Sequence, residues 1–347
     1  MKMNIPANSD EKPQESISIL FENNALLPML FGENDTTLSR LEQKLGVTLT
    51  SRGNILAISG PTSSVQTARH ILEDLYSQLE RGGDVSPGDV DAAIRISKDS
   101  NSRKAVGKVG VTNLAIHTLK KDVKPYSNVQ ASYVKALFER DMIFAIGPAG
   151  TGKTYLAVAM AVNQFINGRV NRIILSRPAV EAGEKLGFLP GDLKEKIDPY
   201  LRPLYDALFD MMPAEKVMRH LENGEIEVAP LAFMRGRTLS NAYIILDEAQ
   251  NSTATQMKMF LTRLGENSKM VITGDLSQMD LPRDVKSGLA DATRKLNNID
   301  GIEIIRFSDQ DVVRHDLAAK IVYAYEEWDR EKKKRNSKSS VADRDLD

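Results

Sequence analysis

Apolar residues along this chain fall into short continuous runs that alternate with helical stripes. Runs of strand type lie at 141–146 (DMIFAI), 173–176 (IILS), 242–246 (AYIIL), 269–275 (KMVITGD) and 302–307 (IEIIRF). A helix-forming stretch, YLAVAMAVNQFI, follows the first of them at 155–166. Continuous apolar runs are typical of strands buried on both faces, so this alternation predicts an α/β fold with a parallel sheet.

The first 82 residues show a different pattern. We expect a strand at 16–23, one or two short helices at 26–46, a hairpin at 47–60 and an amphipathic helix at 65–79 behind the capping residues Thr62 and Ser63. Few residues separate these elements. They predict a small α+β module over residues 1–82.

A change in charge separates the two patterns. Residues 1–94 hold 7 basic and 13 acidic side chains, a net of −6, whereas residues 95–124 hold 8 basic and 2 acidic, a net of +6. Four glycines or prolines interrupt the stretch RGGDVSPGDVD without an apolar period. We therefore predict a basic linker at 83–124, a core domain at 125–327 and a disordered charged tail at 328–347.

The composition of the chain excludes several kinds of catalytic and metal site. The chain has no cysteine, which excludes disulfides, thiol catalysis and cysteine-ligated zinc, and its four histidines are scattered. A metal must therefore have oxygen ligands. With 46 basic and 47 acidic residues the net charge is −1, so any basic surface is local. Since there is no signal-peptide run and no stretch of about 20 apolar residues, we expect a cytoplasmic protein without a membrane span.

One motif lies between the first strand and the helix that follows it. It reads GPAGTGKT and comprises Gly147, Pro148, Ala149, Gly150, Thr151, Gly152, Lys153 and Thr154. This is a phosphate loop, in which backbone N–H groups surround the α- and β-phosphates of a nucleotide at a helix N-terminus. Lys153 is expected to reach the β- and γ-phosphates and the Thr154 hydroxyl to ligate Mg²⁺.

Hydrolysis needs a second acidic site, and the run AYIIL ends in Asp247 and Glu248. Ligands of a doubly wound sheet bind at the carboxyl ends of its strands, where these acids emerge. Asp247 is expected to hold Mg²⁺, and Glu248 to orient and deprotonate the attacking water. The alternative is a solvated acidic pair that opens a helix, favoured by the helix dipole.

Two glutamines extend the candidate site. The run at 269–275 leads to Asp275 and Gln278, and the Gln278 amide is suited to contact the γ-phosphate or the attacking water. This stretch resembles the GDxxQ motif of superfamily-1 helicases, and the tetrad from Asp247 to Gln250 resembles their DExx box. Gln130 precedes the loop where those enzymes keep an adenine-reading glutamine, which favours ATP over GTP. An exposed helix residue is the alternative for Gln130.

These motifs, together with SRPAVEAGEKLGFLPGD, FMRGRTLSNAYIILDEAQN and DVVRH, closely resemble the PhoH-like ATPases from about Ser127 to Tyr325. The resemblance implies a RecA-like P-loop NTPase core, cytoplasmic location and ATP binding. It also implies a role in RNA metabolism that includes proposed helicase activity and an endoribonuclease partner in ribosomal RNA maturation.

The first module resembles a small KH-type nucleic-acid domain in its order of strand, helices, hairpin and helix. KH domains hold a nucleic-acid backbone with a Gly-x-x-Gly loop. Here the corresponding residues 32–35 read GEND, which lacks the second glycine and adds two carboxylates that repel phosphate. A packing or oligomerisation module is therefore an equal alternative for residues 1–82.

Efficient hydrolysis needs an arginine on the transferring phosphoryl group. Superfamily-1 helicases place ATP between two cores, and this chain has one, so we expect a closed homo-oligomer, plausibly a hexameric ring, that supplies the arginine from a neighbour. Arg314 is the first candidate because it follows the last predicted strand, with Arg235, Arg237 and Arg177 behind it. A surface salt bridge is the alternative role of Arg314.

RNA has three candidate contacts: Arg177 with Lys185, the basic residues of 95–124, and the run at 332–335. The sequence as a whole predicts a Mg²⁺-dependent ATPase that acts on RNA. The main alternative is a nucleotide-gated adaptor that binds ATP and a protein partner with little turnover, and a phosphotransferase is a weaker third. Glu248 favours turnover, since an adaptor needs no water-activating carboxylate.

Overall fold

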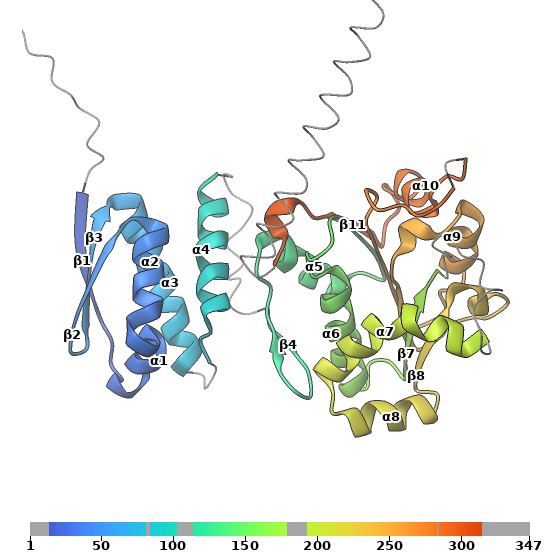
Figure 1. The fold of residues 1–347 in the computed structure, drawn as a ribbon, viewed down its shortest axis with the longest axis horizontal. Coiled ribbons are helices and arrows are strands. Elements are labelled where there is room, and N and C mark those ends of the chain that lie inside the picture. The colour runs from blue at the N-terminus through green and yellow to red at the C-terminus, as the bar shows by residue number, and fades with distance from the viewer. Residues whose placement is uncertain (1–13, 81–83, 103–113, 179–192, 283, 314–347) are drawn as a thin grey trace, which may run out of the picture.

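The computed structural model describes residues 14–80, 84–102, 114–178, 193–282 and 284–313. Figure 1 shows two lobes side by side, an N-terminal lobe built around a small sheet and a core lobe built around a larger one. None of the described helices is both long enough and apolar enough to span a membrane.

The N-terminal lobe follows the predicted order of elements. It comprises β1 (Gln14–Leu20), α1 (Leu27–Phe31), α2 (Thr36–Leu45), β2 (Thr48–Arg52), β3 (Ile55–Pro61), α3 (Thr62–Glu80) and α4 (Pro87–Ser102). The strands form an antiparallel sheet in the order β1-β3-β2. Residues 32–35 connect α1 to α2, and Asn34 and Asp35 both adopt positive φ there. That this lobe is a KH module stays a prediction.

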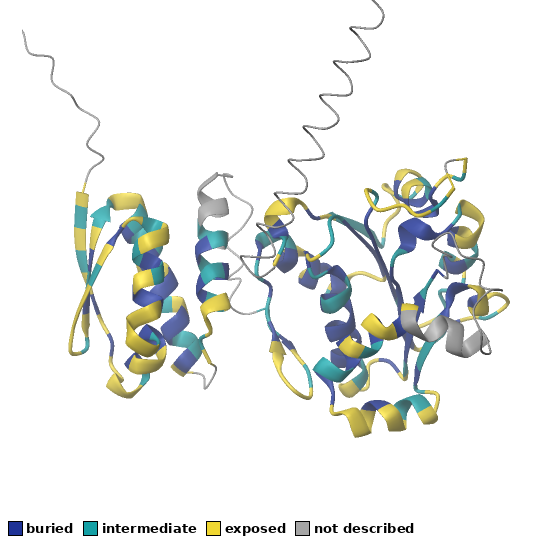
Figure 2. Cartoon of the chain, viewed as in Figure 1, coloured by how far each residue is buried: buried dark blue, intermediate teal, exposed yellow. Residues whose placement is uncertain are grey.

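Its core lies between the sheet and the helices. The inward-facing residues Leu56 and Ile58 of β3 are fully buried, and the opposite positions of the strand face solvent, as expected of a sheet covered on one side. They pack against the apolar stripe of α3, which includes Val65 and Leu72. Figure 2 shows this separation of buried and exposed residues.

Helix α4 differs from the prediction for its segment, which was assigned to a basic linker. Its residues Val90 and Ile94 are buried in the core of the N-terminal lobe. Asp91 of α4 also forms ion pairs with Arg40 Nε at 3.0 Å and Lys44 Nζ at 2.9 Å, both on α2. The described residues 87–102 therefore form a helix docked on this lobe rather than an open linker.

The core lobe alternates strands and helices. Its elements are β4 (Ile116–His117), β5 (Asp122–Val123), α5 (Asn128–Glu139), β6 (Met142–Ile146), α6 (Lys153–Ile166), β7 (Arg172–Arg177), α7 (Leu193–Met211), α8 (Ala214–Glu222), β8 (Ile226–Pro230), β9 (Ala242–Leu246), α9 (Ala254–Leu261), β10 (Lys269–Gly274), α10 (Gly288–Lys295) and β11 (Ile302–Arg306). Short 3₁₀ turns occur at Asn24–Leu26, Glu33–Asp35, Leu231–Met234, Ala249–Asn251 and Asp309–Asp311.

The larger sheet is parallel throughout its described strands, in the order β11-β6-β10-β9-β7-β8. Consecutive strand residues enter opposite hydrophobic clusters, because side chains alternate across a sheet. Tyr243 and Ile245 of β9 join the cluster under α5, α6 and α7, whereas Ile244 and Leu246 join the one under α9 and α10. The predicted α/β fold with a parallel sheet around a phosphate loop is confirmed.

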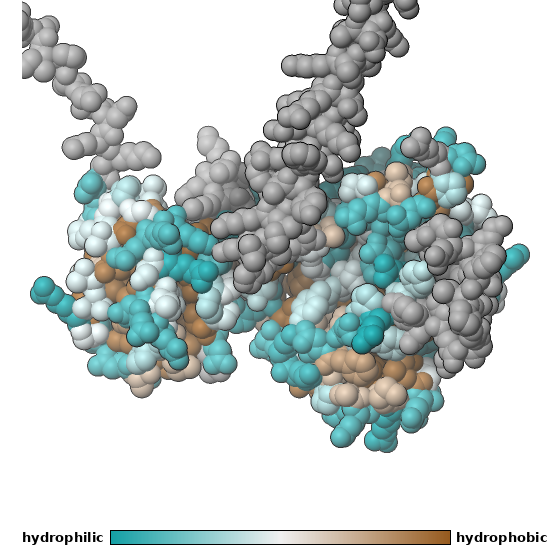
Figure 3. Space-filling model, in the orientation of Figure 1, coloured by the Kyte–Doolittle hydropathy of each residue, from teal (hydrophilic) through white to brown (hydrophobic). Residues whose placement is uncertain are grey.

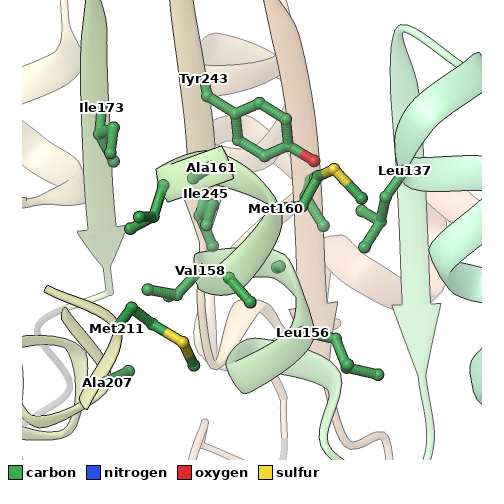
Figure 4. Packing of buried hydrophobic residues seen from close by; sticks show 14 of the residues in the cluster. Leu137, Leu156, Val158, Met160, Ala161, Ile173, Ala207, Met211, Tyr243 and Ile245 are labelled. Carbon is green, nitrogen blue, oxygen red and sulfur yellow. The ribbon is translucent and has the colours of Figure 1, made fainter. Parts of the chain in front are cut away.

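Helix α6 is almost entirely buried, which explains why its sequence lacks a polar face. Figure 4 shows its residues Val158 and Met160 among side chains of β9, α5 and α7. The helix that begins at the phosphate loop is therefore held on several sides. Because the strands are parallel, their carboxyl ends lie at one edge of the sheet, and the predicted site residues gather there.

Candidate nucleotide site

The phosphate loop occupies the turn from β6 into α6. Gly150 and Gly152 have φ of 80° and 79°, which glycine adopts without strain. Gly147 has φ of 152°, and a Cβ atom there would lie 2.6 Å from the carbonyl oxygen of Phe307. Its N–H donates to the Gly274 carbonyl at 3.1 Å. The loop is therefore shaped by close backbone approach and leaves the amides at the start of α6 for a ligand.

Lys153 is folded back onto this loop. Its ammonium donates to the carbonyls of Gly147 and Pro148, each at 2.7 Å, and only 8% of the residue is exposed. Burial lowers the pKa of Lys153, while the nearby carboxylates, Asp275 first, act to raise it. A buried cation held by two neutral carbonyls is suited to an incoming anion.

Thr154 and Asp247 meet at the carboxyl edge of the sheet. The Thr154 hydroxyl donates to Asp247 Oδ1 at 2.6 Å, and the Thr273 hydroxyl donates to the same oxygen at 2.7 Å. Asp247 is 6% exposed. These hard oxygen donors fit Mg²⁺, which binds one or two protein carboxylates and completes its shell with phosphate and water. The described residues contain no group of three histidines or acids that would hold a metal by themselves.

Glu248 follows Asp247 and has left-handed backbone geometry, with φ of 51°. Its Oε1 lies 3.5 Å from Nη2 of Arg177, and its Oε2 accepts a hydrogen bond from the Gln250 amide at 2.5 Å. The prediction that the acidic pair lies beside the phosphate loop agrees with the structure, since Asp247 and Glu248 line the same hollow as Lys153.

Gln250 connects this acid to the next strand. It is 1% exposed, accepts from the Asp275 N–H at 3.0 Å and donates to the Gln278 carbonyl at 3.2 Å. Asp275 Oδ1 accepts from the Ser277 N–H, whereas its Oδ2 is buried without a hydrogen-bond partner among the described residues. Gln278 is exposed and lines the hollow, as expected of a side chain that contacts phosphate or water.

Gln130 lies on α5 and is buried, 2% exposed, so the alternative of an exposed helix residue is wrong. Its side-chain oxygen accepts from the Tyr126 N–H at 2.5 Å, and its side-chain nitrogen donates to the Thr151 carbonyl at 3.0 Å. Gln130 thus stabilises the phosphate loop through a hydrogen bond from α5. Its contact with adenine stays a prediction.

Two hollows differ in chemistry. The one at the phosphate loop has a volume of about 240 Å³ and is lined mainly by charged, polar and glycine residues. A larger groove of about 720 Å³ lies between α7, α8 and β8, with apolar walls that include Phe209 and Leu221. Figure 3 shows apolar surface in the region of α7 and α8. Because only the smaller hollow combines a phosphate cradle with a general-base candidate, it is the candidate functional site.

The predicted arginines are placed differently. Arg237 makes a two-point ion pair with Glu227, at 2.6 and 2.7 Å, which accounts for its charge, and Arg235 is exposed. Arg314, Lys185 and the run at 332–335 lie outside the described residues. The N–H of Val313, which precedes Arg314, donates to the Gly150 carbonyl at 2.9 Å, so the chain reaches the phosphate loop at that point.

The sequence motifs indicate no role of its own for Thr273 or Gln250, although both contact the acidic pair. A threonine one residue before the end of β10 carries no motif of its own. Its role depends on β10 lying beside β9, which only the strand order shows.

Comparisons with known proteins identify relatives over most of the chain. The profile of the PhoH-like protein family matches residues 122–326. A PhoH-like protein of Bacillus subtilis is 52% identical over 297 residues, covering 86% of this chain and 93% of that protein. A PhoH-like protein of Mycobacterium leprae is 48% identical over 300 residues, covering 86% and 85%. Protein PhoH of Escherichia coli is 45% identical over 244 residues, covering 66% and 69%.

Solved structures show weaker likeness. The SWI2/SNF2 ATPase core of Sulfolobus solfataricus in complex with dsDNA has a TM-score of 0.34 at 14% identity, covering 55% of this chain and 46% of that one. The Pif1 helicase of Candida albicans has a TM-score of 0.29 at 15% identity, covering 53% and 39%.

Proposed function

The chain belongs to the PhoH-like protein family, and from that premise we propose that it is a Mg²⁺-dependent ATPase acting in RNA metabolism. One observation carries the proposal: Thr154 of the phosphate loop is hydrogen-bonded to Asp247, and Glu248 stands beside it at the same hollow. A binding site alone does not need a second acid at this position.

In the proposed reaction the loop amides and Lys153 bind the triphosphate, with Lys153 turning from the loop carbonyls to the β- and γ-phosphates. Thr154 and Asp247 hold Mg²⁺, which when bound neutralises charge on the phosphates. Glu248 orients the attacking water and accepts its proton, and Gln278 contacts the γ-phosphate or that water. Gln130 is proposed to read adenine.

The finer parts of the proposal rest on the family and on the charge pattern. We propose RNA as the nucleic acid, an endoribonuclease as a protein partner, and a cytoplasmic location. We also propose a closed homo-oligomer, plausibly a hexameric ring, in which Arg314 of one subunit completes the site of the next.

Two variants test the division of roles. Lys153→Ala is expected to abolish ATP affinity, because it removes the cation on the phosphates. Glu248→Gln is expected to keep affinity while reducing turnover about 10²-fold or more, since only water activation is lost. Binding of a fluorescent ATP analogue and release of inorganic phosphate measure the two effects. Equal loss of binding in both variants contradicts these roles, and a wild type that binds ATP without turnover favours the adaptor.

A further inference from the structure

Arg177 links the proposed base to a neighbouring helix. It ends β7 at the carboxyl edge of the sheet, and its Nη1 donates to the Tyr200 carbonyl of α7 at 2.9 Å. Its Nη2 lies 3.5 Å from Glu248 Oε1. The Arg177 and Glu248 side chains are 22% and 35% exposed, so both are partly accessible to solvent.

Both carboxylate oxygens of Glu248 face another side chain. Oε1 faces the guanidinium and Oε2 accepts from Gln250. A general base must hold its water within hydrogen-bond distance and take its proton, and here the side chains of Arg177 and Gln250 stand at the two oxygens. A water that binds at either oxygen therefore has to displace or share one of these contacts.

Of the two side chains at Glu248, Arg177 is the one that can move away. Gln250 is buried, and its carbonyl is fixed by the Asp275 N–H, so its amide has little freedom to turn. The Arg177 contact is long and partly exposed, and ion pairs of this kind are weak. The bond to the Tyr200 carbonyl uses the other nitrogen and does not depend on Glu248.

We propose that an RNA backbone phosphate takes the Arg177 guanidinium from Glu248 and so switches the base on. Guanidinium groups bind phosphate through two parallel hydrogen bonds, which a single contact at 3.5 Å does not match. Arg177 is then a positioning residue that couples RNA binding to hydrolysis. This inference rests on the proposed ATPase function and gives it a mode of regulation.

The test compares steady-state ATP hydrolysis with and without a single-stranded oligouridine of about 20 nucleotides, long enough to cover a typical single-strand site. The wild type is expected to be slow alone and faster with RNA. Arg177→Gln is expected to raise the basal rate at least about tenfold, a part of what a positioned base contributes, and to abolish stimulation. Arg177→Met keeps the aliphatic stem with different polarity and is expected to behave alike, which excludes a folding defect peculiar to one variant.

A matched control lies on the same strand. Arg172 begins β7 and donates to the Ser240 carbonyl at 3.4 Å, far along the strand from Glu248, so Arg172→Gln is expected to keep the basal rate and the stimulation of the wild type. Combining Arg177→Gln with Glu248→Gln is expected to remove the rate increase. Fluorescence anisotropy of labelled oligouridine is expected to show a salt dependence reduced by about one unit of log-log slope in Arg177→Gln.

Three results would overturn the inference, and they differ in what they mean for the proposed ATPase function. A fall in basal rate in Arg177→Gln means that the arginine acts on the nucleotide and overturns the inference, while the ATPase proposal stands. Unchanged stimulation by RNA in that variant overturns it as well. Absence of hydrolysis in the wild type and both Arg177 variants, with or without RNA, overturns the inference together with the proposed function.

Discussion

Gly147 offers a direct test of how the phosphate loop is built. At φ of 152° it occupies backbone space that is in practice restricted to glycine. A Cβ atom added there meets the Phe307 carbonyl oxygen at 2.6 Å and the Phe307 Cβ at 2.7 Å. Phe307 has no room to withdraw, since it is buried and its N–H donates to the Ile146 carbonyl at 2.7 Å.

The cost of Gly147→Ala follows from two terms. Backbone strain in this region is about 1–3 kcal/mol. Forcing a methyl group into a packed site adds about 1–3 kcal/mol. We therefore expect a loss of about 4 kcal/mol in the free energy of unfolding of the core lobe. Gly168→Ala is the matched control, because Gly168 has φ of 67° and nothing within 4 Å of its added Cβ. There only strain remains, about 1–2 kcal/mol.

Differential scanning calorimetry measures the contrast. A domain of 150–250 residues loses about 2–4 °C of melting temperature per kcal/mol. Gly147→Ala is thus expected to melt about 5–10 °C below Gly168→Ala, given a difference of about 2.5 kcal/mol. ATP affinity should fall in Gly147→Ala and stay unchanged in Gly168→Ala. Equal melting temperatures for the two variants would refute a rigid contact between the loop and Phe307.

Three further predictions concern charge, buried polarity and assembly. Hydrogen bonds from Lys121 and Tyr155 lower the pKa of Asp210, so its contribution to stability is present at neutral pH and fades as pH falls through that lowered value. Asp210→Asn should therefore lower the melting temperature at about pH 7, and the difference from the wild type should shrink as the pH falls below the ordinary pKa of an aspartate, so a constant difference contradicts this. Gln250→Leu leaves the buried Asp275 N–H without its acceptor and should lower the free energy of unfolding in urea by about 1–3 kcal/mol. The exposed control Gln43→Leu should lower it by at most about 0.5 kcal/mol. Mixing Arg314→Ala with Glu248→Gln chains should restore ATP hydrolysis if the arginine acts in trans, and an inactive mixture despite subunit exchange, or an active monomer in sedimentation, opposes the ring.

Strands that are buried at every position are the easiest to predict from the sequence. β6 and β9 are buried at all five positions, and both appear in the sequence as unbroken apolar runs. β8, at the edge of the sheet, is only partly buried, and its sequence IEVAP carries no such run. Helix α4 was missed because glycine and charge dominate its segment, although Pro87 at its first turn is a helix-start signal.

The candidate site, too, could be predicted only in part. The phosphate loop and the acidic pair were predicted because their residues are consecutive, and the chemistry is carried by spacing along the chain. The bond from Thr273 to Asp247 and the pairing of Arg177 with Glu248 join residues from different strands. Such contacts depend on strand order, which no local pattern of residues encodes. The burial of Gln130 was missed for a similar reason, since its partner Thr151 lies in a different element.

The position of β6 in the sheet has a consequence for biosynthesis. Its two neighbours, β10 and β11, follow it by more than a hundred residues, and the Phe307 carbonyl that presses on Gly147 comes later still. The phosphate loop emerges from the ribosome long before the strands that shape it, whereas the elements of the N-terminal lobe are adjacent in sequence and can fold as soon as they appear. A nascent chain therefore has no finished nucleotide site until the last core strand has been made, and a chain cut short before that strand would carry the motif without the cradle.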